Sequence, residues 1–172
     1  MALAGILAAC SLLGSPAVVD SARAQDQVPQ EVKVKYSLFY EYYKNKDFKS
    51  ASPYLSWLLE NAPTFRGTRN WERGINMYES IAENVEDEAL TKTYLDSALA
   101  LYDRIFPTFA EQETEIDSAS WILNRGRFLQ THSNAYSDRQ NEVLDAYMKA
   151  FNMNPTELNP YYVRYITDRY VS

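Results

Sequence analysis

The 172-residue sequence has few of the residues that carry enzymatic chemistry. Its one histidine, His132, excludes a metal site built from several histidines. With only three glycines after residue 24, the sequence has no glycine-rich loop that could hold a phosphate. Because we find no nucleophile–base pair, metal-ligand set or cofactor motif, we expect that the protein is not an enzyme and holds no cofactor or metal.

One alternative stays open, because serine–lysine or paired-carboxylate chemistry leaves no motif in a single sequence. Such an enzyme would need a deep polar pocket that holds two carboxyl groups with strongly shifted pKa values. His132 lies near the predicted end of a helix, where we expect a surface or capping role.

Basic residues are outnumbered by acidic ones, so that the net charge is −6 and the sequence pI is about 4.9. A protein that binds the phosphate backbone in general needs a basic face, and we therefore expect no nucleic-acid partner. The apolar fraction of 46% is too high for a disordered chain and predicts a folded core.

The first 24 residues differ from the rest, because they are apolar and end in the segment Ala22–Ala24, a small-x-small cleavage pattern. We interpret residues 1–24 as a signal peptide and residues 25–32 as a linker. The protein is then expected to be exported, to a bacterial periplasm or the outer cell surface.

A second interpretation of the N-terminus rests on the segment Leu7–Cys10, which is similar to a bacterial lipobox and would make Cys10 a lipid anchor. A retained anchor helix is the third interpretation, although Gly14 and Pro16 interrupt it. Cleavage after Ala24 is favoured, and it leaves a mature chain without cysteine or disulfides.

Residues 33–172 show apolar side chains at helical spacing, interrupted by polar breaks and prolines. They predict a helical domain with hairpins at about 33–63, 68–107 and 117–155 and a terminal helix at 159–171. Pro63, Pro107 and Pro155 are expected to close the three hairpins, and Asp117 is expected to cap the first helix of the third. Because Pro53 would interrupt a helix capped by Asp47, we expect the second helix to begin nearer residue 51.

The hairpins resemble tetratricopeptide (TPR) repeats, which combine a bulky residue, a tyrosine, an alanine and a closing proline in a helix–turn–helix unit. The matching positions are Tyr42, Phe48, Ala51, Leu55, Leu58 and Pro63 in the first unit, Trp71, Tyr78 and Pro107 in the second, and Trp121, Phe128, Ala150 and Pro155 in the third. Units two and three are longer than the family period of about 34 residues, as in divergent, exported bacterial members.

The resemblance covers about residues 33–170. It implies an all-α fold, a right-handed superhelix of stacked antiparallel helix hairpins, whose concave side is lined by the first helix of each pair. It further implies a scaffold or adaptor that binds a protein or peptide partner.

Candidate binding residues follow from this arrangement. Tyr42 is expected in the core, and Tyr36, Tyr40 and Tyr43 are then expected to face the concave side, where tyrosine suits recognition. Alternatively, these tyrosines serve helix packing.

Four further candidates are polar. Arg69, Arg73 and Asn76 are predicted to form a clamp for a carboxylate or a peptide backbone, and Arg125 is a candidate on the third unit. Salt bridges to Glu and Asp residues on the same helices are the alternative role for these arginines.

Two further hypotheses concern the partner. A surface lipoprotein could capture a small ligand or glycan on its tyrosine-rich face. The terminal helix at 159–171, which no helix follows, could mediate self-association if its apolar face were exposed.

Overall fold

The computed structural model describes residues 28–156 and 158–170, and this part of the chain is all-α, with seven α-helices and no strand. The predicted signal peptide and Cys10 lie outside the described residues. The helices are α2 (Gln30–Lys44), α3 (Phe48–Asn61), α4 (Arg69–Ala82), α5 (Glu88–Glu111), α6 (Ser118–Thr131), α7 (Gln140–Met153) and α8 (Pro160–Tyr170), with a short 3₁₀ turn, η2 (Ser137–Arg139), ahead of α7.

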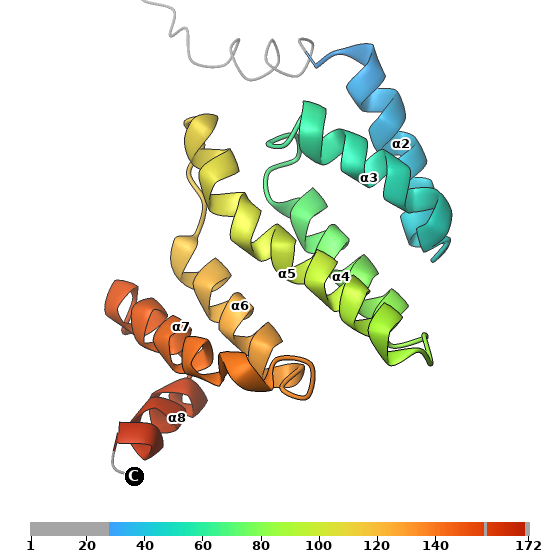
Figure 1. Cartoon of the computed structure of the whole chain (residues 1–172). Helices are drawn as coiled ribbons and strands as arrows, with labels where there is room; N and C mark the ends of the chain where they lie inside the picture. The colour runs from blue at the N-terminus through green and yellow to red at the C-terminus, as the bar shows by residue number, and fades with distance from the viewer. Residues whose placement is uncertain (1–27, 157, 171–172) are drawn as a thin grey trace, which may run out of the picture.

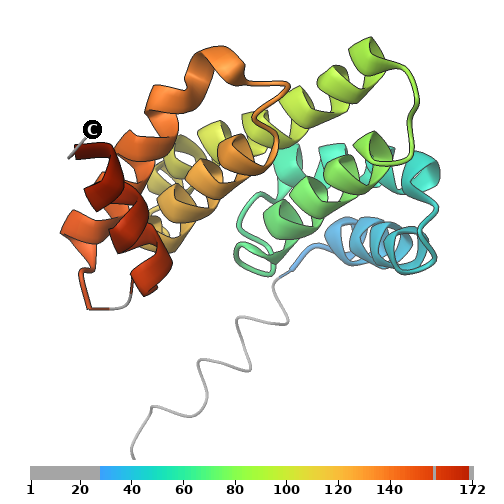
Figure 2. The ribbon, with the colours of Figure 1, turned by 90° about the horizontal axis from the view of Figure 1, so that it is seen from below.

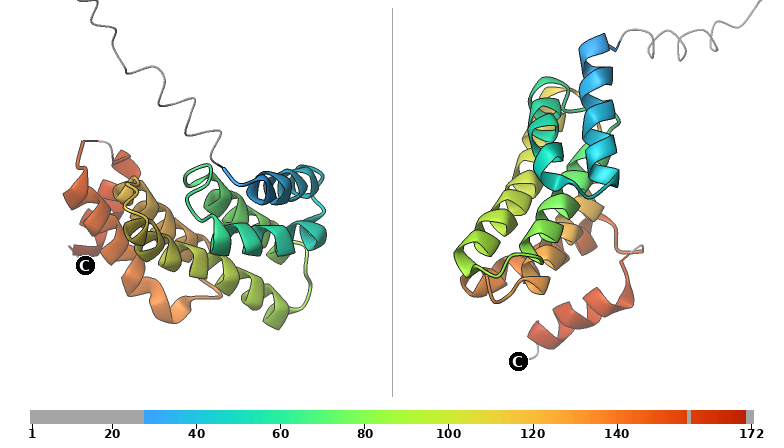
Figure 3. Two further views of the ribbon diagram at one scale, coloured as in Figure 1. Left: turned by 90° about the horizontal axis from the view of Figure 1, so that it is seen from above. Right: turned by 90° about the vertical axis from the view of Figure 1, so that its right-hand side faces the viewer.

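Consecutive helices pack in pairs, α2 with α3, α4 with α5 and α6 with α7, and each pair is an antiparallel hairpin (Figure 1). Neighbouring hairpins meet where α3 contacts α4 and where α5 contacts α6, and α8 packs against α7. The hairpins follow one another along the molecule, so that α2 and α8 lie at opposite ends (Figures 2 and 3). We call the contact of the first two hairpins the first junction, and that of the last two the second junction.

Three aspartates fix helix starts. The side chains of Asp47, Asp87 and Asp117 each accept a hydrogen bond from the backbone N–H three residues further on, at the first turns of α3, α5 and α6. These bonds satisfy N–H groups that have no partner inside the helix. The role of Asp47 and Asp117 as caps was expected from the sequence.

Left-handed residues end two of the helices. Lys46 after α2 has φ 59° and Glu113 after α5 has φ 49°. In each case the next N–H bonds back to a carbonyl of the last helical turn, from Asp47 to Tyr42 at 2.9 Å and from Thr114 to Phe109 at 2.9 Å. This 6→1 bond is the Schellman arrangement, which here forms without glycine.

Pro53 does not delay the start of α3. The helix begins at Phe48, three residues before the expected position. The Asp47 cap fixes the first turn. The proline removes only the hydrogen bond to the carbonyl of Lys49, and both residues are exposed, so that water can reach this carbonyl.

Two other expected boundaries also differ. Helix α5 continues through Pro107 to Glu111, and in this extra turn Phe109 is fully buried, with its ring 6.2 Å from that of Trp71. At the other end, α2 begins at Gln30, inside the predicted linker 25–32, because Val32 is buried in the core. In each case the burial of one apolar side chain outweighs the local sequence signal, which is Pro107 in α5 and the polar linker residues before α2.

A single cluster of buried side chains runs through the three hairpins, from Val32 in α2 to Tyr147 in α7. Two glycines permit close helix contacts in it. A Cβ atom on Gly74 would lie 2.7 Å from Leu101 Cδ1, and one on Gly126 would lie 2.9 Å from both Ala146 Cβ and the Tyr147 ring. The hairpins are therefore joined into one continuous core.

Candidate functional site

Helices α2, α4 and α6, the first of each hairpin, follow one another along one side of the molecule (Figure 2). Between α2 and α4 lies a group that we call the Tyr–Arg cluster, formed by Tyr36, Tyr40, Arg66 and Arg73. The Tyr36 and Tyr40 rings stack at 5.9 Å, as expected for residues one helical turn apart. The Arg73 guanidinium lies 4.8 Å from the Tyr40 ring centroid, and its Nη1 donates a hydrogen bond of 3.1 Å to Tyr36 Oη.

Arg66 completes the Tyr–Arg cluster from the connection between α3 and α4, with its guanidinium 5.0 Å from the centroid of the Tyr36 ring. Arg66 and Gly67 both have positive φ, 68° and 62°, and this turn brings the arginine back over α2. Asn70 holds the turn, because its buried amide donates a hydrogen bond of 3.0 Å to the Phe65 carbonyl.

The second feature lies between α4 and α6. A groove of about 550 Å³, which we call the polar groove, is lined by Glu72, Asn76 and Glu79 of α4 and by Asn124 and Arg127 of α6, among other residues. The buried Tyr102 of α5 also lines it. The carboxylates and amides at its rim can accept and donate hydrogen bonds.

Hydrogen bonds fix the acids of this groove. Glu79 Oε1 lies 3.0 Å from Nε2 of His132, the residue that follows α6, and Glu72 accepts a bond of 2.7 Å from Thr68. At the start of α6, the Ser120 hydroxyl and then the Ser120 backbone N–H lower the pKa of Asp117. The carboxylate of Asp117, which also lines the groove, therefore stays charged, and the groove offers negative charge to a ligand.

Burial, and next the negative charge of Glu79, raises the pKa of Tyr102 well above the usual value for tyrosine. Its hydroxyl therefore keeps its proton in ordinary conditions.

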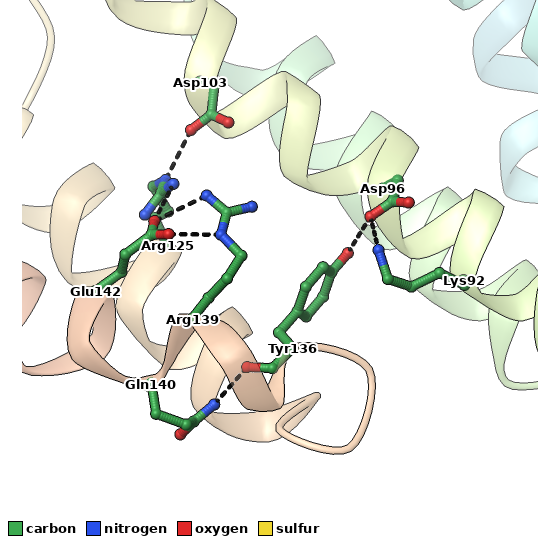
Figure 4. A network of polar contacts seen from close by, with 8 residues as sticks. All are labelled: Lys92, Asp96, Asp103, Arg125, Tyr136, Arg139, Gln140 and Glu142. Carbon is green, nitrogen blue, oxygen red and sulfur yellow. Dashed lines mark hydrogen bonds and ion pairs between the residues drawn. The ribbon is translucent and has the colours of Figure 1, made fainter.

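Ion pairs hold the third hairpin together and join it to α5 across the second junction (Figure 4). Arg125 of α6 donates from Nε to Asp103 of α5 at 2.7 Å and from Nη2 to Glu142 of α7 at 2.8 Å. Arg139 binds the same carboxylate with bonds of 2.6 and 2.8 Å. The bonds from Arg139, followed by those from Arg125, lower the pKa of Glu142 to about 2.

A second part of this network joins the turn ahead of α7 to α5. Tyr136 is buried and donates a hydrogen bond of 3.0 Å to Asp96, which also pairs with Lys92 (Figure 4). Burial, and then the bond to Asp96, raises the pKa of Tyr136 well above its usual range. The tyrosine therefore remains a donor that fixes the turn to α5.

The structure brings three predicted candidates together, because Tyr36, Tyr40 and Arg73 meet in the Tyr–Arg cluster. Asn76 lies apart from them in the polar groove, and Arg69 lies exposed at the start of α4. The predicted clamp of Arg69, Arg73 and Asn76 is thus divided between two places.

The other candidates lie elsewhere. Tyr43 packs within the first hairpin, 5.7 Å from the Phe39 ring and 6.0 Å from the Phe48 ring. Tyr42 is only partly buried, and Phe39 takes the fully buried place on α2. Arg125 is occupied by two ion pairs, but with acids of α5 and α7 and not, as the alternative from the sequence had it, with acids of its own helix.

Sequence reasoning missed several residues of the site. Glu72 and Glu79 flank Asn76 at spacings of four and three residues, so that a polar stripe on α4 could have revealed them. Nothing in the sequence pointed to Arg66, because its position depends on the left-handed turn.

No protein-family model, no curated protein and no solved structure matches the chain. Within residues 28–156 and 158–170, none of the helices is both long and apolar enough to span a membrane. The same residues include no group of three or more His, Cys, Asp or Glu side chains placed to hold a metal ion.

Proposed function

We propose that the protein is an exported, TPR-like scaffold whose hairpins form a right-handed superhelix and whose α2, α4 and α6 face binds a segment of a protein partner. The observation that supports the proposal best is the polar groove of about 550 Å³ between α4 and α6. A groove between the first helices of successive hairpins follows such a face, as a chain laid along it would require.

The chemistry of the polar groove suits an extended polypeptide. Asn76 of α4 and Asn124 of α6 line it together, and each amide has both donor and acceptor atoms for a peptide backbone. Asn76 makes no hydrogen bond to any other described residue, so its amide is available to a ligand. The carboxylates of Glu72 and Glu79 favour basic side chains on the bound segment.

A peptide library tests this function. We expect the protein to select extended peptides, and we expect Asn76→Ala combined with Asn124→Ala to weaken the selected peptides about tenfold or more. Asn152→Ala, an exposed asparagine on α7, is the matched control and should leave binding unchanged. The proposal would be contradicted if the selected peptides bound the variant with both Asn76→Ala and Asn124→Ala as tightly as they bind the Asn152→Ala control.

Self-association through α8 stays a prediction. The apolar residues Tyr162, Tyr165 and Ile166 pack against the core, and Tyr161 is the large ring that α8 leaves exposed. Light scattering separates the outcomes: a dimer that is lost on deletion of residues 156–172 supports self-association. A monomer that this deletion leaves unchanged contradicts it.

A further inference from the structure

The Tyr–Arg cluster holds two cations that no carboxylate neutralises. Neither Arg66 nor Arg73 forms an ion pair with a residue of the described chain, whereas Arg125 and Arg139 are bound to Asp103 and Glu142. Both arginines lie over the ring of Tyr36. In a chain with a net charge of −6, two neighbouring arginines that form no ion pair with the described residues need an explanation.

We infer that the Tyr–Arg cluster is a binding subsite for a carboxylate side chain of the polypeptide that the α2, α4 and α6 face holds. The inference rests on the proposed function and assigns it a second subsite, on the opposite edge of α4 from the polar groove. The partner segment then carries an acidic residue over α2 and α4.

The geometry prepares both guanidiniums for an anion. Arg73 is held by its hydrogen bond to Tyr36 and by its contact with the Tyr40 ring. Arg66 lies over the ring of Tyr36. A guanidinium has five N–H donors, and Arg73 uses one of them here. Because stacking on the rings fixes the side chains in advance, a carboxylate loses less binding energy to their ordering.

The surroundings favour an acidic residue of a peptide over other anions. Tyr40 is 41% exposed, and its ring offers the apolar contact that accompanies a bound side chain. The opposite edge of α4 carries Glu72 and Glu79, which repel a second acid and thereby restrict the acidic part of the segment to the cluster.

The arginine side-chain Nε–H signals of the protein, followed by NMR during titration with hexaglutamate at about 0.15 M salt, test the inference. We expect saturable shifts of Arg66 and Arg73 and unchanged signals from the paired Arg125 and Arg139. Hexalysine should produce no shift in the cluster. The acidic net charge of the protein works against unspecific binding of hexaglutamate.

Variants complete the test. Arg73→Gln is expected to weaken hexaglutamate about tenfold, since it removes one charge-assisted contact. Arg169→Gln is the control, because Arg169 lies 5.2 Å from the Tyr165 ring at the far end of the molecule and should not affect binding. Equal affinity of both variants, or no shift in Arg66 and Arg73, overturns the inference.

Two further outcomes separate the inference from the proposed function. If library peptides bind through Asn76 and Asn124 while hexaglutamate leaves the Tyr–Arg cluster unchanged, the function stands and the subsite is wrong. If an oligomer of galacturonic acid shifts Arg66 and Arg73 and hexaglutamate does not, the cluster serves a glycan and the inference is overturned.

Discussion

At the first junction between hairpins arginines rest on aromatic rings, whereas at the second an arginine is bound by carboxylates beside the buried rings of Tyr102, Trp121 and Phe128. At the first, Arg73 of α4 rests on Tyr36 and Tyr40 of α2. At the second, Arg125 of α6 is bound on both sides, by Asp103 of α5 and Glu142 of α7. Both junctions join hairpins of the same topology.

This difference determines which charges remain for a partner. Ion pairs at the second junction and within the third hairpin occupy Arg125 and Arg139, so that these two arginines hold helices together. Contact with the rings at the first junction holds its arginines without using up their N–H donors. We therefore expect the second junction to be sensitive to pH, and the first to be sensitive to loss of its rings.

Trp71→Ala is expected to have the largest effect, because Trp71 is fully buried and its Nε1 donates a hydrogen bond of 2.9 Å to the Pro63 carbonyl. We expect the free energy of unfolding to fall by about 3–5 kcal/mol in urea denaturation. Trp57→Ala, at a half-buried tryptophan of α3, should cost clearly less. Equal losses would mean that Trp71 has no special part in the first junction.

Gly126→Ala is expected to cost about 1–3 kcal/mol in the same measurement, because the new Cβ meets Ala146 Cβ and the Tyr147 ring. Gly74→Ala should cost less, since the atoms that it meets are the ends of Leu55 and Leu101, which can move. A larger loss for Gly74 would reverse this ranking and locate the more rigid packing at the first junction.

Glu142→Gln tests the ion pairs within the third hairpin, next to the second junction. We expect a loss of about 1–2 kcal/mol at neutral pH, because two arginines lose a charged acceptor that is partly exposed. Glu86→Gln, at an exposed acid between α4 and α5, is the control and should have almost no effect.

The stability that the Glu142 carboxylate contributes should depend on pH. In the folded protein the pKa of Glu142 is lowered from 4.5 to about 2, so the stabilisation is complete above the unfolded pKa and is lost as the pH falls toward 2. The difference between the wild type and Glu142→Gln should therefore shrink as the pH is lowered from about 5 to about 2. A difference that stays constant over this range would contradict the role of the carboxylate.

Tyr36→Phe is expected to have the smallest effect, about 0.5–1 kcal/mol, since it removes one partly exposed hydrogen bond to Arg73 and keeps the ring contacts. Tyr40→Phe is the matched control, because the Tyr40 hydroxyl makes no hydrogen bond to another described residue. Thermal unfolding of the two variants measures the difference. A loss for Tyr40→Phe as large as that for Tyr36→Phe would argue against the bond.

The sequence predicted the helices better than their ends. Asp47 and Asp117 cap helices as expected, because a cap depends on residues within one turn. Pro107 did not end α5, since burial of Phe109 against Trp71 lies outside any local pattern.

The candidate site was predicted in part, for the same reason. Tyr36 and Tyr40 were expected on one face of α2, and their spacing of four residues lets the two rings stack. The spacing of Arg69, Arg73 and Asn76 predicted a clamp that the structure divides, because α4 turns one edge toward α2 and another toward α6.

The sequence by itself determined that residues 33–155 form helices in pairs and that one more helix follows, because apolar spacing, caps and turns act over a few residues. Only the tertiary structure decided which charges are neutralised. The partners of Arg125 lie 22 and 17 positions away in the chain, and Glu79 lies 53 positions from His132. Contacts at such separations depend on how hairpins meet, and among the described residues this leaves Arg66 and Arg73 without a carboxylate partner.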